Sequence, residues 1–211
     1  VYSLSFFVPI FISMTGKNRK NYKLEGSVME IFKGLSMLLV TLALFSVFSF
    51  KAPKGQKAMS GLAGAAVASY LVEAIHKYIS GDFAGIAFLG EVGHASGGMG
   101  GVAAAALVPI SMGVNPVLAI TAGAAMAGYG ILPGFVAGYA VGLLGPVLEK
   151  KVPKGLDIIV GAILIAPFAR GIAFAVDPIV NSTLLSIGTM ISTAADQSPI
   201  LMGFILGGII K

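Results

Sequence analysis

The residues of this chain that are best placed to bind a polar ligand are Glu91 and His94, which are three positions apart. They lie in an apolar region, within a stretch from residue 90 to residue 101 that contains six glycines. A carboxylate accepts hydrogen bonds from hydroxyl groups, and an imidazole both donates and accepts them. On one helical turn the two side chains share a face. This combination is suited to a sugar, whose hydroxyl groups need both kinds of partner.

Glycines beside the pair add backbone atoms to the predicted site. Gly93, Gly97 and Gly98 have no side chain, so their N–H and C=O groups are open to a polar ligand. A stretch so rich in glycine forms only a weak helix, and we expect residues 84–101 to be a broken or re-entrant membrane element. The alternative is that the carboxylate and the imidazole only satisfy each other at a water interface.

A second candidate site follows a later apolar run. Asp177, followed by Pro178, comes directly after Val176, and Asn181 lies four residues further on. These polar side chains can bind a polar substrate, and Asp and Pro equally suit a turn that caps a helix. Both interpretations stay open.

Other ionisable side chains have plainer interpretations. Arg170 lies deep in an apolar run, where it either extends to the interface or pairs with an acidic residue such as Asp157 or Asp177. Glu73 and His76 lie near the end of their apolar run, and we interpret them as an interfacial pair.

Several classes of site are excluded by residues that the sequence lacks. There is no cysteine, which removes disulfides, thiolate metal sites and cysteine nucleophiles. Neither a GxxxxGK(S/T) phosphate loop nor an HExxH zinc motif is present. The basic residues form no stripe with interleaved aromatics, so nucleic acid is not an expected partner. We predict no metal and no cofactor.

The composition indicates that lipid covers much of the protein. Of 211 residues, 56% are hydrophobic and 11% are charged, and the mean hydropathy is +0.93. Soluble domains carry roughly 25% charged residues, so a soluble fold of this composition has too few charges for its surface. The net charge of +5 comes from loops beside apolar runs. The sequence therefore predicts an all-α, polytopic transmembrane protein in a lipid bilayer.

Apolar runs of roughly 20 residues, the length that crosses a bilayer, mark the expected transmembrane helices. They are residues 34–50, 58–78, 102–127, 131–148 and 156–176. Pro109 and Pro116 fall inside the third run, which is therefore either kinked or divided into two shorter pieces. Residues 179–196 are more polar and are interpreted as a protein-lined helix or a loop with a short helix.

The whole chain, residues 1–211, is interpreted as one membrane domain that is a fragment of a longer protein. It opens on Val1 rather than on Met, and its last apolar stretch stops at Lys211. Basic loops favour the cytoplasmic side of a membrane. We therefore expect the loop at residues 150–154 on that side. If residues 84–101 cross the membrane once, the loop at residues 51–57 lies on the same side.

Four segments of the second half resemble a known family. They are GILPGFVAGY at 130–139, KKVPKGL at 150–156, ILIAP at 163–167 and VDPI at 176–179. Their order resembles the membrane subunit, enzyme IIC, of the sugar phosphotransferase system, in its fructose/mannitol-like superfamily. The later segment QSPILMG at 197–203 resembles the branch that includes the perfringolysin-regulator (PfoR-type) proteins.

The resemblance implies that this membrane subunit binds a sugar while a separate IIB phosphocarrier protein donates phosphate from a phosphohistidine or phosphocysteine. The chain would take part in a protein-N(pi)-phosphohistidine–sugar phosphotransferase reaction without holding the phosphoryl carrier itself. A homodimer in the bacterial plasma (inner) membrane is the corresponding expectation.

Two departures from the family pattern keep other functions open. The fructose-type signature D-x-G-G-P-x-N-K would begin where this sequence stops, at Lys211, and Asp177 stands where that pattern has an uncharged residue. A PfoR-type membrane sensor or regulator without transport is therefore an alternative. An ion-coupled transporter in which Glu91 and His94 titrate is a third.

Overall fold

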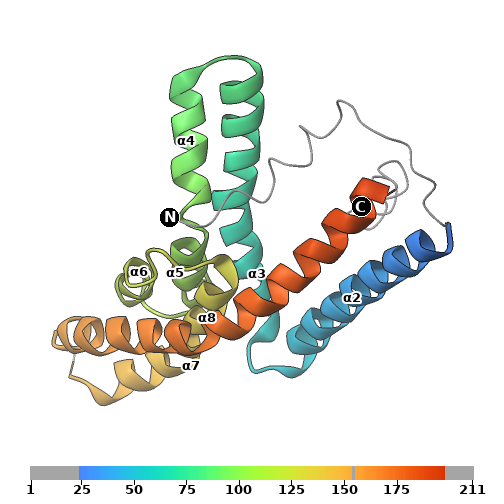
Figure 1. The fold of residues 1–211 in the computed structure, drawn as a ribbon. Coiled ribbons are helices and arrows are strands. Elements are labelled where there is room, and N and C mark those ends of the chain that lie inside the picture. The colour runs from blue at the N-terminus through green and yellow to red at the C-terminus, as the bar shows by residue number, and fades with distance from the viewer. Residues whose placement is uncertain (1–23, 154, 198–211) are drawn as a thin grey trace. The chain divides into compact units, whose positions relative to one another are not determined.

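The computed structural model describes residues 24–153 and 155–197, which are almost entirely helical and include no strand (Figure 1). The predicted all-α class is therefore confirmed. Two compact units divide the chain: residues 47–180 form one, and residues 1–46 together with 181–211 form the other. Expectations about the first 23 residues and about residues 198–211 lie outside the described part.

The centre of the 47–180 unit is helix α5 (Gly100–Met112), which packs against both α3 (Gly55–Ala66) and α7 (Ile131–Lys151) (Figure 1). A glycine sets the approach of α3. A Cβ built on Gly61 would lie 2.6 Å from the Cα of Val108 in α5, which is closer than real side chains come. The backbones of the two helices are therefore in direct contact.

Glycines also join α5 to α7. A Cβ on Gly138 would lie 2.9 Å from the Cα of Ala105, and a Cβ on Gly134 would overlap the backbone of Gly101. Earlier residues of α7 meet earlier residues of α5, so these two helices run parallel. Lipid gives apolar helices little reason to associate, and close contact between small residues takes its place.

A short helix, α6 (Pro116–Ala124), returns the chain from the end of α5 to the start of α7. Gly113, with φ of 94°, follows α5, and the Asn115 side chain accepts the N–H of Val117 at 2.9 Å to cap α6. The first residue of α6 is Pro116, at a position where a backbone N–H would have no partner within the helix. Of the two outcomes predicted for the 102–127 run, the division into two pieces is confirmed.

Helix α8 (Asp157–Gln197) contributes its residues up to 180 to the same unit, where it packs on α6. A Cβ on Gly161 would overlap a side chain of α6. Ile165, Ala169 and Ala173 continue this buried face. Their spacing of four keeps one side of α8 on its neighbour.

The C-terminal end of this helix lies beyond residue 176, where the apolar run had predicted it. The interpretation of Asp177 and Pro178 as a capping turn after Val176 is wrong, because α8 continues through both residues. The polar run 179–196 is likewise helical. A proline removes one backbone hydrogen bond, and membrane helices tolerate this where neighbouring groups satisfy the freed carbonyl.

Three helices among the described residues are long and apolar enough to cross a membrane: Gly55–Phe83, Ile131–Lys151 and Gly161–Ser182. Helices α4 (Ala87–Gly97) and α5 meet at a bend of 59°. If they count as one broken span, they make a fourth crossing. The broken or re-entrant element predicted at residues 84–101 is therefore confirmed.

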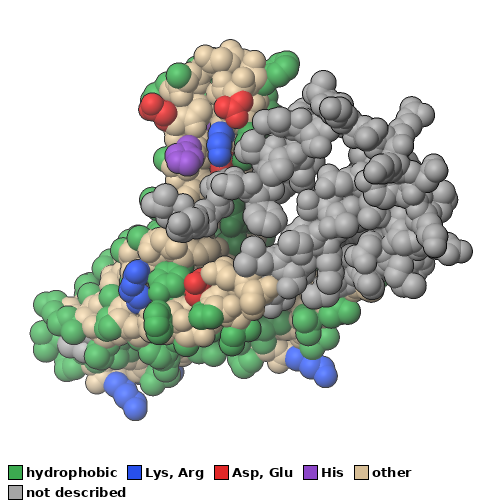
Figure 2. Space-filling view, viewed as in Figure 1, with side chains coloured by type: hydrophobic (Ala, Val, Ile, Leu, Met, Phe, Trp, Pro, Cys, Tyr) green, Lys and Arg blue, Asp and Glu red, His purple; other side chains and the backbone are tan. Residues whose placement is uncertain are grey.

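On the face shown in Figure 2, hydrophobic side chains are exposed over much of the described part of the chain. Large apolar side chains such as Phe50, Phe83 and Phe174 are exposed. A lipid environment accounts for them, because patches of this extent are rare on soluble monomers. The other compact unit contains the start of α2 (Leu24–Lys51), which is the helix expected at residues 34–50, and the end of α8.

Two basic loops lie at the same end of the 47–180 unit. Lys54 donates from Nζ to the carbonyl oxygen of Met112 at 2.9 Å, which places the 51–57 loop beside the end of α5. Glu149 accepts the N–H of Asn115 at 2.9 Å, which places the end of α7, and the loop that follows it, beside the start of α6. Both loops therefore lie at one end of this unit, and their place on the cytoplasmic side stays a prediction.

We expect Gly134→Ala to destabilise the protein, because its new Cβ would overlap the backbone of α5. Overpacking costs about 1–3 kcal/mol, whereas alanine gains up to about 1 kcal/mol over glycine in helix propensity. Thermal unfolding of the purified protein in detergent measures the difference. Gly171→Ala is the matched control, because nothing lies within 4 Å of a Cβ built there. Equal unfolding temperatures for the two variants would contradict the packing described.

Candidate functional site

The predicted site residues around Glu91 lie in one half of a helical hairpin. After α3 the chain continues in two π-helical stretches, Val67–Leu71 and Ala74–Phe83, turns near Gly85 and returns as α4 (Figure 1). We call residues 67–83 the π-helical arm. Longer π-helical stretches are rare in proteins, and π-helical turns recur at functional sites.

Helix α4 packs on the π-helical arm through glycines. A Cβ on Gly81 would lie 2.5 Å from the Cα of Gly90, and Cβ atoms on Gly93 and Gly97 would overlap the opposite arm. The glycines of α4 are three and four residues apart, which places them on one face of the helix. The absence of side chains on this face lets the two backbones touch.

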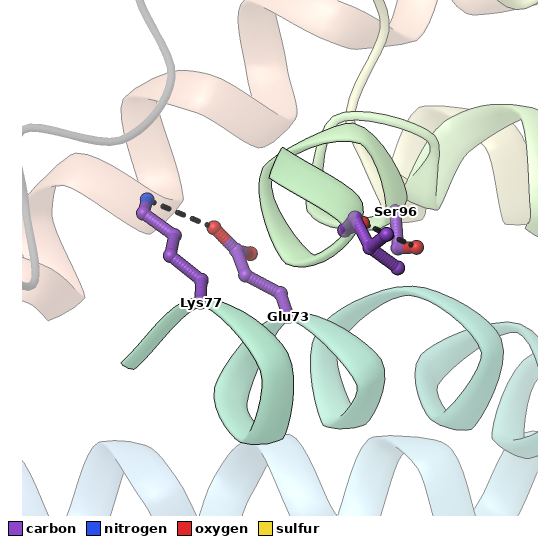
Figure 3. Close-up of polar contacts among 4 residues, drawn as sticks. Glu73, Lys77 and Ser96 are labelled. Atoms are coloured by element: carbon purple, nitrogen blue, oxygen red, sulfur yellow. Dashed lines mark hydrogen bonds and ion pairs between the residues drawn. The ribbon is translucent and has the colours of Figure 1, made fainter. Parts of the chain in front are cut away.

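An ion pair lies beneath these glycines (Figure 3). Lys77 Nζ is 3.2 Å from Glu73 Oε1, and only 4% of Glu73 is exposed. A Cβ on Gly97 would overlap the Glu73 carboxylate. Both charges lie in the candidate span Gly55–Phe83, where an ionisable group is costly unless it is paired. The interpretation of Glu73 as half of an interfacial pair with His76 is wrong, because its carboxylate is buried and pairs with Lys77.

Further polar atoms lie on the hairpin. In the described part of the chain, His76 Nδ1 and the Tyr78 hydroxyl are buried without a hydrogen-bond partner. Lys77 Nζ lies 5.0 Å from the centroid of the Tyr78 ring. Ser96 Oγ donates to the carbonyl oxygen of Val92 in its own helix at 2.9 Å (Figure 3). An unpaired buried polar atom costs about 1–3 kcal/mol, so the hairpin carries more polar groups than its own packing satisfies.

Glu91 and His94 lie on the exposed side of α4. Their spacing places both on one side, as predicted, and away from the contact with the π-helical arm. Gly93 and Gly97 are buried in that contact, whereas Gly98 is exposed at the bend between α4 and α5. A role for these five residues in binding stays a prediction.

Asp177 and Asn181 lie four residues apart, and therefore on one side of α8. Asp177 is half-buried near the end of the 47–180 unit, and Asn181 is exposed where the other unit resumes. Their role in binding also stays a prediction. Among the described residues there is no group of three or more His, Asp or Glu side chains that is placed to hold a metal ion.

The break between α4 and α5 adjoins a second break, between α6 and α7. A Cβ on Gly101 would lie 2.8 Å from the carbonyl oxygen of Gly130, which precedes α7. A Cβ on Gly100 would lie 3.3 Å from the Tyr70 hydroxyl. Neither N-cap residue, Met99 nor Gly130, gives its helix a side-chain hydrogen bond. Two parallel helices thus begin side by side, and their first N–H groups favour negative charge and hydrogen-bond acceptors.

Arg170 connects α8 to this second break. Its Nη1 donates to the carbonyl oxygens of Ala125 at 2.6 Å and Ala127 at 3.3 Å. Its guanidinium lies 5.0 Å from the centroid of the Tyr129 ring. Carbonyls at the end of a helix lack intrahelical partners, and a cation there complements the helix dipole. The sequence did not predict carbonyl groups as partners of Arg170.

These features define a polytopic membrane protein that holds ionisable groups within its spans and brings two broken helices together. Residues 56–211 match the family described as Phosphotransferase system, EIIC. The match covers most of the chain, which belongs to this family and is a membrane component of sugar transport. It includes the hairpin, both breaks and α8. No curated protein and no solved structure matches the chain.

We expect Arg170→Met to lower the free energy of unfolding by about 1–2 kcal/mol, because it leaves the carbonyls of Ala125 and Ala127 without their donor. Arg170→Lys should lose less, since it keeps the charge but not the planar fork. Denaturant unfolding in detergent measures both. Lys150→Met, at an exposed position, is the control. Wild-type stability in Arg170→Met would show that these contacts contribute nothing.

Proposed function

We propose that this chain is the sugar-binding permease subunit of a phosphoenolpyruvate-dependent phosphotransferase system in the bacterial plasma membrane. The observation that carries the proposal is the family match over residues 56–211, a region that includes both helix breaks. Many transporters bind their substrate where discontinuous helices meet within the bilayer. The adjoining breaks before α5 and before α7 are an arrangement of that kind.

The sugar binds beside the break between α4 and α5. Gly98 lies at the break, His94 one turn before it and Glu91 about two turns before it, so a carboxylate and an imidazole line the approach. Both side chains hydrogen-bond the hydroxyl groups of the sugar. Gly93 and Gly97 hold α4 in position, because their missing side chains let it contact the π-helical arm. The first N–H groups of α5 supply further donors.

Asp177 and Asn181 are each a further ligand for sugar hydroxyl groups. Asp177 also bears on the branch of the family. The resemblance to the fructose/mannitol-like superfamily and to PfoR-type proteins rests on segments from residue 130 onward, and Asp177 stands where the fructose-type pattern is uncharged. This departure favours a second candidate function, a PfoR-type membrane sensor that keeps the fold without transport.

Phosphorylation requires a partner protein. The bond between phosphorus and the histidine or cysteine side chain of a IIB phosphocarrier breaks, a bond forms from phosphorus to a hydroxyl oxygen of the bound sugar, and the hydroxyl proton passes to solvent. The two basic loops lie at one end of the 47–180 unit, and basic loops favour the cytoplasmic side. IIB docks at this end, and two copies of the chain form the working homodimer.

We expect Glu91→Gln to raise the dissociation constant for the sugar by roughly tenfold to a hundredfold. A hydrogen bond to a charged group contributes about 1.5–3 kcal/mol, and about 1.4 kcal/mol is a tenfold change in affinity. Radiolabelled hexoses and hexitols, tested one by one on the full-length protein in vesicles that enclose a IIB protein, provide the measurement. Asp82→Asn alters an exposed carboxylate on the same hairpin and should bind as the wild type does.

Each other result of that experiment has a definite meaning. An unchanged dissociation constant in Glu91→Gln removes this carboxylate from the site and leaves the permease function standing. If the folded wild type yields no phosphorylated sugar with any compound, transport is overturned and the sensor is favoured. Accumulation of unphosphorylated sugar that collapses with a proton ionophore indicates an ion-coupled transporter instead.

A further inference from the structure

Few side chains hold α4 against the π-helical arm. The buried residues of α4 are two glycines, Gly93 and Gly97, so its contact with the arm is mostly backbone against backbone. Beneath it lies the ion pair of Glu73 and Lys77, in which the Glu73 carboxylate is buried and Lys77 is partly exposed. Removing the carboxylate from water is costly, and its attraction to Lys77 repays this cost only when geometry is good and other hydrogen bonds assist. The closed contact is therefore less stable than its close backbone packing alone would make it.

The neighbouring helix α5, in contrast to α4, is held in place by buried side chains. It buries side chains along its length, including Ala104, Val108 and Met112. Segments with few buried apolar contacts open at a small fraction of the free energy of global unfolding. We therefore expect the free energy of local opening to be low for α4 and high for α5.

The backbone changes direction at both ends of α4. Gly85, with φ of 73°, lies in the turn before it, and no atom lies within 4 Å of a Cβ built there. At its other end the chain bends by 59° between Gly97 and Gly100. Hinges are commonly a few residues at the ends of an element that absorb a large backbone rotation. Helix α4 is thus a short rigid segment between two such points.

We propose that α4 is a lid, which swings away from the π-helical arm at these two points, admits water to the buried Glu73 carboxylate and opens the helix break to a polar substrate. The inference rests on the proposed function for the identity of that substrate, a sugar. Glu91 and His94 move with α4, so opening also carries the predicted ligands toward or away from the break. The buried carboxylate lowers the stability of the closed state, because opening returns its charge to water.

Hydrogen–deuterium exchange of the full-length protein in lipid nanodiscs, without any ligand, tests the lid. We expect the amides of residues 87–97 to exchange at least about tenfold faster than those of residues 100–112. In the double variant Glu73→Met/Lys77→Met, apolar side chains of similar length replace the pair. Exchange in residues 87–97 should then slow by about tenfold, because opening no longer hydrates a buried carboxylate, while residues 100–112 stay as they were.

The control is Asp82→Met, which removes one exposed charge of the same hairpin and should leave both rates unchanged. Faster exchange of residues 87–97 in the double variant would show that the ion pair fastens α4, and it would overturn the lid. Unchanged exchange in the double variant, or equal wild-type rates in α4 and α5, would overturn it as well. Sugar uptake with a static α4 contradicts only the lid, whereas a mobile α4 without uptake contradicts only the transport proposal.

Discussion

Direct contact between helix backbones at glycine positions is the constraint on which the rest of this structure depends. Apolar helices in lipid gain little from burying further apolar surface, so their association relies on close packing. Gly61 and Gly138 bring α3 and α7 onto α5, and Gly93 brings α4 onto the π-helical arm. A close backbone contact of the same kind places Gly101 beside the start of α7, so that the two helix breaks lie next to each other. The two helix breaks can lie next to each other because glycine has no side chain to keep the backbones apart.

Broken helices leave backbone carbonyls without partners, and cationic side chains from distant parts of the chain satisfy them. Lys54 bonds Met112 at the end of α5, and Arg170 bonds Ala125 at the end of α6. Each cation gains hydrogen bonds and lies at the negative end of a helix dipole. The charge of Glu73 is met differently, by Lys77 one turn away in its own helix. In this way the chain carries charges in and beside its spans without a metal-ligating cluster among the residues that the structure describes.

Much of the architecture could be predicted from local pattern. The length of the apolar runs predicted the all-α transmembrane class. Pro116 predicted the division between α5 and α6, and the glycines of residues 90–101 predicted the broken element. Pro178 was a misleading signal for the end of a helix, because membrane helices can continue through a proline when neighbouring groups satisfy the freed backbone carbonyl. The π-helical arm had no sequence signal, since π turns differ from α turns by one residue per bond.

The site was harder to predict than the fold. The glycines beside Glu91 were interpreted as a cradle for a ligand, yet Gly93 and Gly97 serve the contact with the opposite arm. The spacing of Glu73 and Lys77 by four residues was a usable signal for an ion pair on one helix face. What the sequence did not show was that α4 would fold back over that face. Long-range pairing of this kind depends on the turn near Gly85 and not on the local pattern at residue 73.

The most direct test compares alanine at two glycines of α3. A Cβ at Gly61 would lie 2.6 Å from the Cα of Val108, whereas a Cβ at Gly64 would lie 3.7 Å from its nearest neighbour, the end of the Leu107 side chain. The unfolding temperature of the purified protein should fall in Gly61→Ala and stay unchanged or rise in Gly64→Ala, since overpacking against a backbone costs about 1–3 kcal/mol. An unfolding temperature that is equal in the two variants would mean that the backbones of α3 and α5 are not in direct contact, and would contradict the central claim.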